Sequence, residues 1–116
     1  MNTEKKPWGY EQIYSITNTN AGSVEVRKNL IVFKQEKLSL QMHRFRTEYW
    51  TVFSGKCWIQ IDKGIYWAIP GTEWEILPMQ RHRIMADGED VLVKEVSNGY
   101  IEDDIIRLED AYGRIK

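Results

Sequence analysis

The chain shows no helical periodicity before residue 100, and this feature constrains its fold more than any other. Apolar residues instead fall in short runs with strand-like alternation, and each run ends at a cluster of turn residues. Asp62-Lys63-Gly64 and Asp87-Gly88 are typical hairpin turns. The expected strands are 10–16, 24–26, 30–33, 38–43, 48–54, 57–61, 65–69, 73–77, 81–85 and 91–96. So many short strands predict an all-β domain, either a sandwich or a barrel.

The two ends of the chain are expected to differ from this pattern. Residues 1–9 are interpreted as an N-terminal arm, so that residues 10–16 become an edge strand followed by the polar loop 17–22. Residues 101–116 are interpreted as a short C-terminal tail, with a strand through Ile105-Ile106 and a helical turn ended by Gly113. Its acidic side chains are expected at a solvated rim: Glu102, Asp103, Asp104, Glu109 and Asp110.

Length and charge narrow the classes of function. A chain of 116 residues has room for one core, so residues 1–116 are read as a single domain. A net charge of −1 and a pI near 6.1 give no basic surface for nucleic acid, and no apolar run is long enough to cross a bilayer. The first ten residues lack the apolar region of a signal peptide. We therefore expect neither a nucleic-acid nor a membrane partner.

The cysteine and tryptophan content adds two expectations. The single cysteine, Cys57, cannot form an internal disulfide, and its alternation with Ile59 and Ile61 predicts a core residue. This is consistent with a cytoplasmic protein. Five tryptophans exceed what one small core needs, which favours a homodimer through an edge strand or the outer face of a sheet. Aromatic faces also suit a sugar-binding surface.

Potential metal ligands gather in the stretch from Leu38 to Gly55. Side chains alternate between the two faces of a strand, so Gln41 and His43 point the same way as Ser39. In the next strand Glu48 alternates with Trp50 and Val52, which marks it as inward-facing. An amide oxygen, an imidazole and a carboxylate directed to one interior point suit a divalent transition metal.

The second of the two histidines in the chain, His82, supplies the fourth expected ligand. It alternates with Ile84, whereas Arg81 and Arg83 are expected on the opposite face. Two histidines that face the interior of one small barrel are interpreted as sharing a metal. A hydrogen-bonded core histidine is the structural alternative.

These spacings resemble the motifs of the cupin superfamily. Gln41-x-His43, four residues, Glu48, six residues and Gly55 resemble the first cupin motif, with Gln in place of the first His and Gln35 in place of the leading Gly. Residues 78–82 resemble the second motif, with one residue missing and no Gly. Within the cupins, nearly the whole chain resembles the type II mannose-6-phosphate isomerase domain. The matching segments are 6–9, 38–43, 46–50, 52–55, 102–107 and 110–114.

Several positions depart from the pattern of that domain. Arg44 and Phe45 stand where the domain has further histidines, and Tyr49 stands where another histidine is common. The loop before His82 and the segment between Gly99 and Glu102 are shortened. No nucleotidyltransferase domain accompanies the chain, which is therefore expected to act alone.

The resemblance implies a cupin barrel, also called a double-stranded β-helix or jelly roll. It implies one divalent metal ion, Zn, Mn, Fe, Co or Ni, held by Gln41, His43, Glu48 and His82. The implied reaction interconverts mannose 6-phosphate and fructose 6-phosphate through a cis-enediol, with a small sugar phosphate as the substrate. A single carboxylate ligand leaves about one net positive charge on the site, which favours the developing enediolate.

The remaining roles are assigned to groups of candidates. A base is required near the reacting carbons, and the candidates are Lys37, Lys94 and Glu95, of which Glu95 alternates with the inward Val91 and Val93. The expected substrate contacts are Ser39, Arg46, Trp50, Arg107 and Arg114, of which the three arginines would bind the phosphate.

Two other classes of function remain open. A nucleotide-sugar ketoisomerase or epimerase of related barrel fold would use His and Tyr without a metal. A non-catalytic cupin would bind a sugar or a small regulator without turnover, and the altered histidine run at Arg44 and Phe45 keeps this alternative open.

Overall fold

The structure is a computed structural model that describes residues 2–18, 22–101 and 104–114. The expected loop residues 19–21 and the acidic residues Glu102 and Asp103 lie outside the described residues. Within the described ranges the chain forms strands and no helix. The strands are β1 (Asn2–Lys6), β2 (Gly9–Asn18), β3 (Val24–Val32), β4 (Leu40–Met42), β5 (Thr47–Ser54), β6 (Cys57–Ile61), β7 (Gly64–Ala68), β8 (Glu73–Ile76), β9 (His82–Ala86), β10 (Val91–Asn98) and β11 (Ile106–Glu109).

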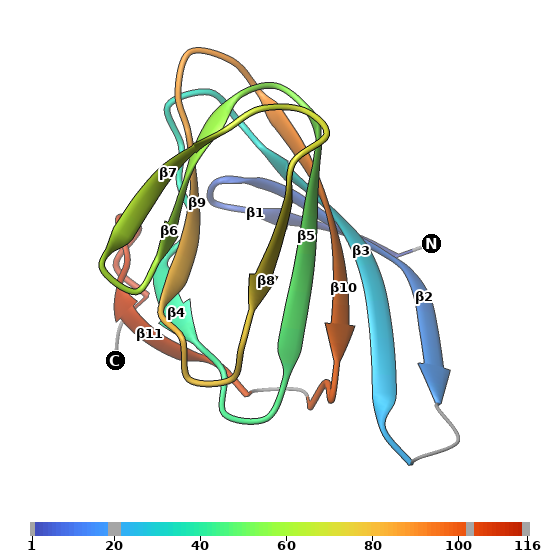
Figure 1. Ribbon diagram of the computed structural model, residues 1–116. Coiled ribbons are helices and arrows are strands. Elements are labelled where there is room, and N and C mark those ends of the chain that lie inside the picture. Colours follow the sequence, from blue (N-terminus) through green and yellow to red (C-terminus); the bar gives the residue numbers. More distant parts are fainter. Residues whose placement is uncertain (1, 19–21, 102–103, 115–116) are drawn as a thin grey trace.

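Two antiparallel sheets face each other and enclose the interior (Figure 1). One sheet has six strands in the order β1-β2-β3-β10-β5-β8, and the other has five in the order β11-β4-β9-β6-β7. Neighbours such as β10 and β5 are distant in the sequence, as in a jelly roll. The all-β barrel predicted from the strand pattern is confirmed.

Within the expected N-terminal arm, residues 1–9, Asn2–Lys6 form strand β1, which pairs with residues 9–13 of β2. Strand β1 is therefore the edge of the six-stranded sheet, and the expectation that residues 10–16 form an edge strand is wrong. The sequence of β1, NTEKK, carries no apolar alternation, which explains why its pattern did not indicate a strand. Gly9 permits the return into β2: its φ is +152°, and a Cβ there would clash with the carbonyl oxygen of Ile31.

The C-terminal segment also differs from its expected form. Its strand is Ile106–Glu109, which pairs with β4 at the edge of the five-stranded sheet. The helical turn expected before Gly113 is wrong, because the chain makes a single turn around the Asp110 side chain. Asp110 accepts hydrogen bonds from the backbone N–H groups of Tyr112 and Arg114, and a side-chain acceptor of this kind replaces helical bonding.

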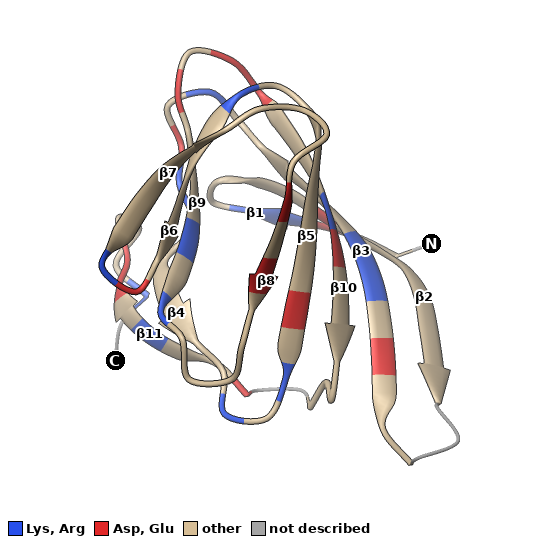
Figure 2. Cartoon of the chain, in the orientation of Figure 1, with Lys and Arg blue, Asp and Glu red and all other residues tan. Residues whose placement is uncertain are grey.

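The interior is divided into an apolar half and a polar half. Four strands carry a buried apolar residue and a buried ionisable residue two positions apart; the pairs are Leu30 and Lys28 on β3, Trp50 and Glu48 on β5, Ile84 and His82 on β9, and Val93 and Glu95 on β10. Figure 2 shows that charged residues interrupt these strands along their length as well as at the loops.

The apolar half packs as one buried cluster. Cys57 belongs to this cluster, as predicted, and burial raises the pKa of its thiol to about 11. The cluster comprises Trp8, Leu30, Val32, Leu38, Trp50, Val52, Cys57, Ile59, Ala68, Ile76, Ile84, Ala86, Val91 and Val93. It therefore supports the polar half from one end of the barrel.

Candidate metal centre

Three potential ligands meet at the boundary between the two halves. His43 follows β4, Glu48 lies in β5 and His82 begins β9, and all three side chains are buried. One ligand atom from each lies within 4.8 Å of the other two. Glu48 Oε2 is 3.1 Å from His43 Nε2, and Glu48 Oε1 is 3.5 Å from His82 Nε2. The arrangement of β5, β4 and β9 around the barrel therefore brings distant segments to one point.

Backbone carbonyls hold both imidazoles in the tautomer that a metal needs. His43 Nδ1 lies 2.5 Å from the Asp104 carbonyl oxygen, and His82 Nδ1 lies 2.9 Å from that of Gln80. A carbonyl only accepts hydrogen bonds, so each Nδ1 carries the proton and donates it. Each Nε2 then presents a lone pair toward Glu48, as in histidines that bind metals.

Electrostatics keep the cluster in its ligand form. Burial alone would raise the pKa of Glu48, but its contact with His43 and the proximity of His82 and of the Arg46 guanidinium hold that pKa well below its usual range. Burial lowers the pKa of His82, against the opposing effect of Glu48. One carboxylate and two imidazole nitrogens form a donor set that borderline divalent metals prefer, so these residues fit such an ion.

Gln41 lies beside this cluster. It is the direct Cα partner of His82 in the β4–β9 pair, and it lines the same cavity as Glu48 and His82. Its side-chain Nε2 donates to Ser39 Oγ over 3.3 Å. The expected fourth ligand is thus positioned at the rim of the three-residue cluster.

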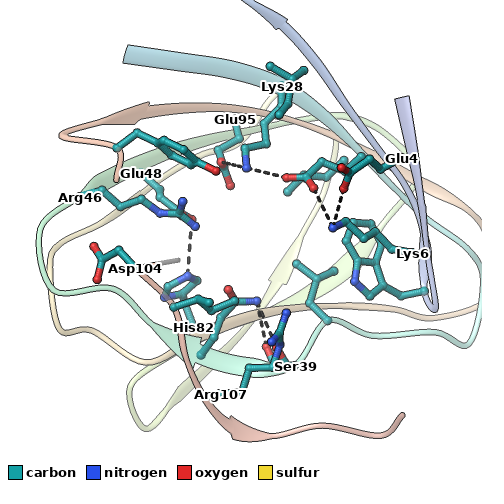
Figure 3. Close-up of a pocket in the computed structure, with 18 of the residues that line it drawn as sticks. Glu4, Lys6, Lys28, Ser39, Arg46, Glu48, His82, Glu95, Asp104 and Arg107 are labelled. Carbon is teal, nitrogen blue, oxygen red and sulfur yellow. Dashed lines mark hydrogen bonds and ion pairs between the residues drawn. The ribbon is translucent and has the colours of Figure 1, made fainter. Parts of the chain in front are cut away.

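A polar cavity of about 340 Å³ opens in front of these residues (Figure 3). Its volume is in the range of small-molecule sites. The N-terminal strand β1 forms part of its wall. Its charged lining residues are Glu4, Lys6, Glu11, Lys28, Arg46, Glu48, Glu95, Asp104, Arg107 and Arg114.

A chain of alternating charges runs along the cavity wall from β1 to β10. Lys6 Nζ contacts Glu11 Oε2 at 3.3 Å, Glu11 Oε1 accepts from Lys28 Nζ at 2.5 Å, and Lys28 Nζ lies 3.6 Å from Glu95 Oε2. Figure 3 shows Lys28 and Glu95 next to each other, with Lys6 and Glu4 farther along the wall. Burial disfavours the charge on Lys28, yet Glu95 and Glu11 outweigh it and raise its pKa.

Glu95 is a second buried carboxylate in the polar half, and it is not part of the candidate ligand cluster of His43, Glu48 and His82. Trp50 Nε1 donates to its Oε1 over 3.1 Å, and Ser97 Oγ donates to its Oε2 over 2.8 Å. Burial, followed by the negative charge of Glu48, raises the pKa of Glu95 above the ordinary glutamate value. A fixed, desolvated carboxylate of this kind is suited to accept a proton.

The structure does not bring the two lysine candidates for the base to the cavity. Lys94 lies on the opposite face of β10 from Glu95, with its Nζ 4.6 Å from the ring centroid of Phe53. Lys37 forms an isolated bridge with Met85. Neither residue is among the described residues that line the cavity.

The arginine candidates for the phosphate differ in their contacts. Arg114 donates to the Asp110 carboxylate through its Nε and Nη2 atoms, and Arg46 forms an ion pair with Glu48. Arg107 lines the cavity opposite Gln41 in the β11–β4 pair, and its buried Nε has no hydrogen-bond partner among the described residues. Of the three arginines, Arg107 is the one without an ion pair among the described residues. Ser39 lines the cavity, as does Trp50, whose ring edge packs on His82.

Three of the departures from the isomerase pattern, Arg44, Phe45 and Tyr49, lie away from the cavity, whereas Tyr100 and Ile101 of the shortened segment after Gly99 line it. The side chains of Phe45 and Tyr49 are exposed. Arg44 and Phe45 lie in the loop between β4 and β5, and their backbone N–H groups donate to the carboxylate of Asp104. Among the described residues, none of these three lines the cavity. The altered histidine run therefore contributes no side chain to the described lining of the cavity.

Sequence reasoning missed three residues of the polar half. Lys28 could have been found, because it alternates with the inward Val26 and Leu30, which is the argument applied to Glu48. Lys6 and Glu11 gave no such signal, since their place in the wall depends on the fold of β1 against β2.

Comparison with known proteins identifies the family. Residues 2–110 match the protein family described as mannose-6-phosphate isomerase C-terminal. The chain belongs to this family. The alginate biosynthesis protein AlgA of Pseudomonas putida is 35% identical over 112 residues, and the mannose-1-phosphate guanylyltransferase of Escherichia coli is 31% identical over 115 residues. These matches cover 94% and 95% of this chain but 22% and 23% of those proteins.

Solved structures of low sequence identity show that the chain has the cupin fold. A point mutant of Bacillus subtilis oxalate decarboxylase OxdC superposes with a TM-score of 0.79 at 17% identity, covering 92% of this chain and 30% of that one. A cupin-2 domain from Rhodospirillum rubrum gives 0.72 at 13% identity, covering 88% and 66%. Within its described residues, the domain has no helix long and apolar enough to cross a membrane.

Proposed function

We propose that this chain is a metal-dependent aldose–ketose isomerase that interconverts mannose 6-phosphate and fructose 6-phosphate through a cis-enediol. The observation that carries this proposal is a cavity lined by Glu48 and His82 of the candidate ligand cluster and by a separate buried carboxylate, Glu95. Family membership supports the substrate class.

His43, Glu48 and His82, with Gln41 beside them, would hold the metal. A divalent ion held by these residues would supply Lewis-acid chemistry to the substrate carbonyl. The protein's own contribution is to hold the imidazoles through Asp104 and Gln80 and to keep Glu48 ionised. Only one of these ligands is charged, so the site keeps a net positive charge toward a developing oxyanion.

Glu95 acts as the base. It takes the proton from C2 of the aldose and returns it to C1, while the hydroxyl proton on O2 passes to O1, so that the carbonyl group moves from C1 to C2 and the ketose forms. The hydrogen bonds from Trp50 and Ser97 fix the carboxylate, so little reorganisation is needed when the proton moves. Lys28 stabilises the anionic form of the carboxylate before the transfer.

Arg107 anchors the phosphate. Its unpaired Nε and its position at the cavity wall support this role over Arg114, which is bound to Asp110. A guanidinium group offers several donors to one phosphate group. Ser39, just before β4, contacts the sugar hydroxyls.

The test is an isotope-exchange assay with metal analysis. Mannose 6-phosphate is incubated with metal-loaded protein in heavy water, and NMR follows deuteration at C2 and the appearance of fructose 6-phosphate. Both signals are expected, and His43→Ala and His82→Ala should lose them together with the bound metal. The exposed Arg27→Ala serves as the matched control.

The absence of exchange and of product, at high protein concentration and with each of several divalent metals, would contradict the isomerase assignment. Unchanged metal content in both histidine variants would contradict the ligand assignment. We also infer a cytoplasmic location, which the buried free thiol of Cys57 supports.

A further inference from the structure

The guanidinium group of Arg46 contacts two candidate ligand atoms, one on His43 and one on Glu48. Its Nη2 is 2.7 Å from His43 Nε2, and its Nε is 2.8 Å from Glu48 Oε2. In the neutral imidazole of His43 the proton is on Nδ1, which donates a hydrogen bond to the Asp104 carbonyl oxygen, so Nε2 carries the lone pair. The arginine therefore donates to the same lone pair that a metal ion would use.

This contact hides part of the ligand set. Gln41, Glu48 and His82 line the cavity, whereas His43 is not among its described lining residues. Arg46 itself lines the cavity and is buried, so its guanidinium stands between the cavity and His43. Its positive charge neutralises Glu48, as a bound cation would.

We propose that Arg46 is a displaceable cation that closes the metal site, and that its guanidinium must leave His43 before a divalent ion binds. This inference rests on the metal-binding part of the proposed function. A hydrogen bond from Nη2 and a metal bond cannot share one lone pair on His43. A divalent ion beside an arginine that stayed in place would also face direct charge repulsion.

The structure contains a place to which the guanidinium can move. The Tyr100 ring centroid is already 5.0 Å from Arg46 Cζ, within the range of a cation–π contact. The carboxylate of Asp104 belongs to the same cavity, and Figure 3 shows it near Arg46. A rotation of the Arg46 side chain toward these two groups would expose His43 Nε2 while the charge remains compensated.

This arrangement predicts a penalty on metal affinity. When only a fraction of the molecules has the open conformation, the apparent affinity falls by that fraction. A charge-assisted hydrogen bond is worth enough that its removal should tighten metal binding roughly ten- to a hundredfold. The substitution Arg46→Gln removes the charge and keeps a polar side chain of similar length.

The first test measures Zn²⁺ affinity, by competition with a chromophoric chelator, for the parent protein, Arg46→Gln and Arg27→Gln. Arg27 is an exposed arginine that pairs with Glu25, so its variant controls for the loss of one positive charge. We expect Arg46→Gln to bind Zn²⁺ more tightly than the parent, and Arg27→Gln to match the parent.

The second test needs no variant and remains valid if Arg46→Gln does not fold. NMR of the ¹⁵N-labelled parent protein follows the Nε–H signal of Arg46, whose ion pair with Glu48 protects it from solvent exchange. We expect saturating Zn²⁺ to shift this signal and to increase its exchange rate with water.

The outcomes separate the two proposals. Equal or weaker Zn²⁺ binding by Arg46→Gln, or an Arg46 Nε–H signal that stays protected at saturation, would overturn the displacement and leave the metal site standing. Failure of the parent and of Arg46→Gln to bind Zn²⁺ or any other divalent ion would overturn both.

Discussion

Lys28 Nζ lies 3.6 Å from Glu95 Oε2, and the two residues are direct Cα partners across β3 and β10. Opposite charges at the same level of adjacent strands give a buried carboxylate a fixed counter-ion on one side. Its other contacts are neutral donors from Trp50 and Ser97. The carboxylate is therefore held in place while burial still favours its protonation.

Replacing this carboxylate should stop the reaction without unfolding the protein. We expect Glu95→Gln to lower kcat roughly 10²- to 10⁴-fold, the usual contribution of a general base. The pKa of Glu95 is raised, and the base must be deprotonated to act. As the pH is lowered, kcat of the parent protein should therefore begin to fall at a higher pH than it would with an ordinary glutamate. A pH profile of kcat measures this acidic loss of activity, and circular dichroism checks the fold. Lys94→Gln, on the opposite face of β10, should behave like the parent.

Removing the phosphate anchor should affect binding more than chemistry. We expect Arg107→Ala to raise KM for mannose 6-phosphate roughly tenfold or more, with a smaller change in kcat, because a remote anchor binds ground and transition states alike. Arg114→Ala should change KM less, since Asp110 already binds that side chain. Steady-state kinetics of both variants measure the difference. Equal effects of the two substitutions on KM would contradict the assignment.

The thiol of Cys57 should be inert in the folded protein. With a pKa of about 11, about one thiol in a thousand is ionised at pH 8, and the side chain is fully buried. We expect a thiol-reactive dye to label the native protein far more slowly than the urea-unfolded chain. Comparable labelling rates in the two states would show that this part of the core opens readily.

We propose that two copies of the chain associate through the outer face of the five-stranded sheet. Trp58 and Trp67 are paired on that face with ring centroids 4.8 Å apart, yet they remain 40% and 44% exposed. Covering such aromatic surface favours association. Light scattering should give a dimeric mass for the parent and a monomeric mass for Trp67→Lys. Phe53→Lys, an exposed position on the other sheet, serves as the control.

Alternation was the most informative signal in the sequence. It predicted the strands around Glu48, His82 and Glu95, and the structure buries all three side chains. The same rule applies to Lys28, whose charge on an apolar face was overlooked. Alternation also separates Lys94 from Glu95, which lie on opposite faces of β10.

Other parts of the site were beyond what the sequence could predict. Strand β1 is polar, and only its pairing with β2 makes it a wall of the cavity. The sequence predicts Arg46 as a phosphate ligand. Its position in the sequence does not reveal that its long side chain folds back onto His43 and Glu48. Contacts of this kind depend on side-chain rotamers and on the approach of separate strands.

The division of the interior into an apolar and a polar half has a consequence for how such a barrel can diversify. A side chain at the polar level can be exchanged without removing an apolar core residue, because the apolar residues lie two positions away on the same strands. The polar side chains are themselves paired, as Lys28 is with Glu95, so new ligand sets have to be introduced as matched pairs that keep the buried charges compensated. Substitutions at Lys28, Glu48, His82 and Glu95 form a natural library for redirecting the chemistry of this fold.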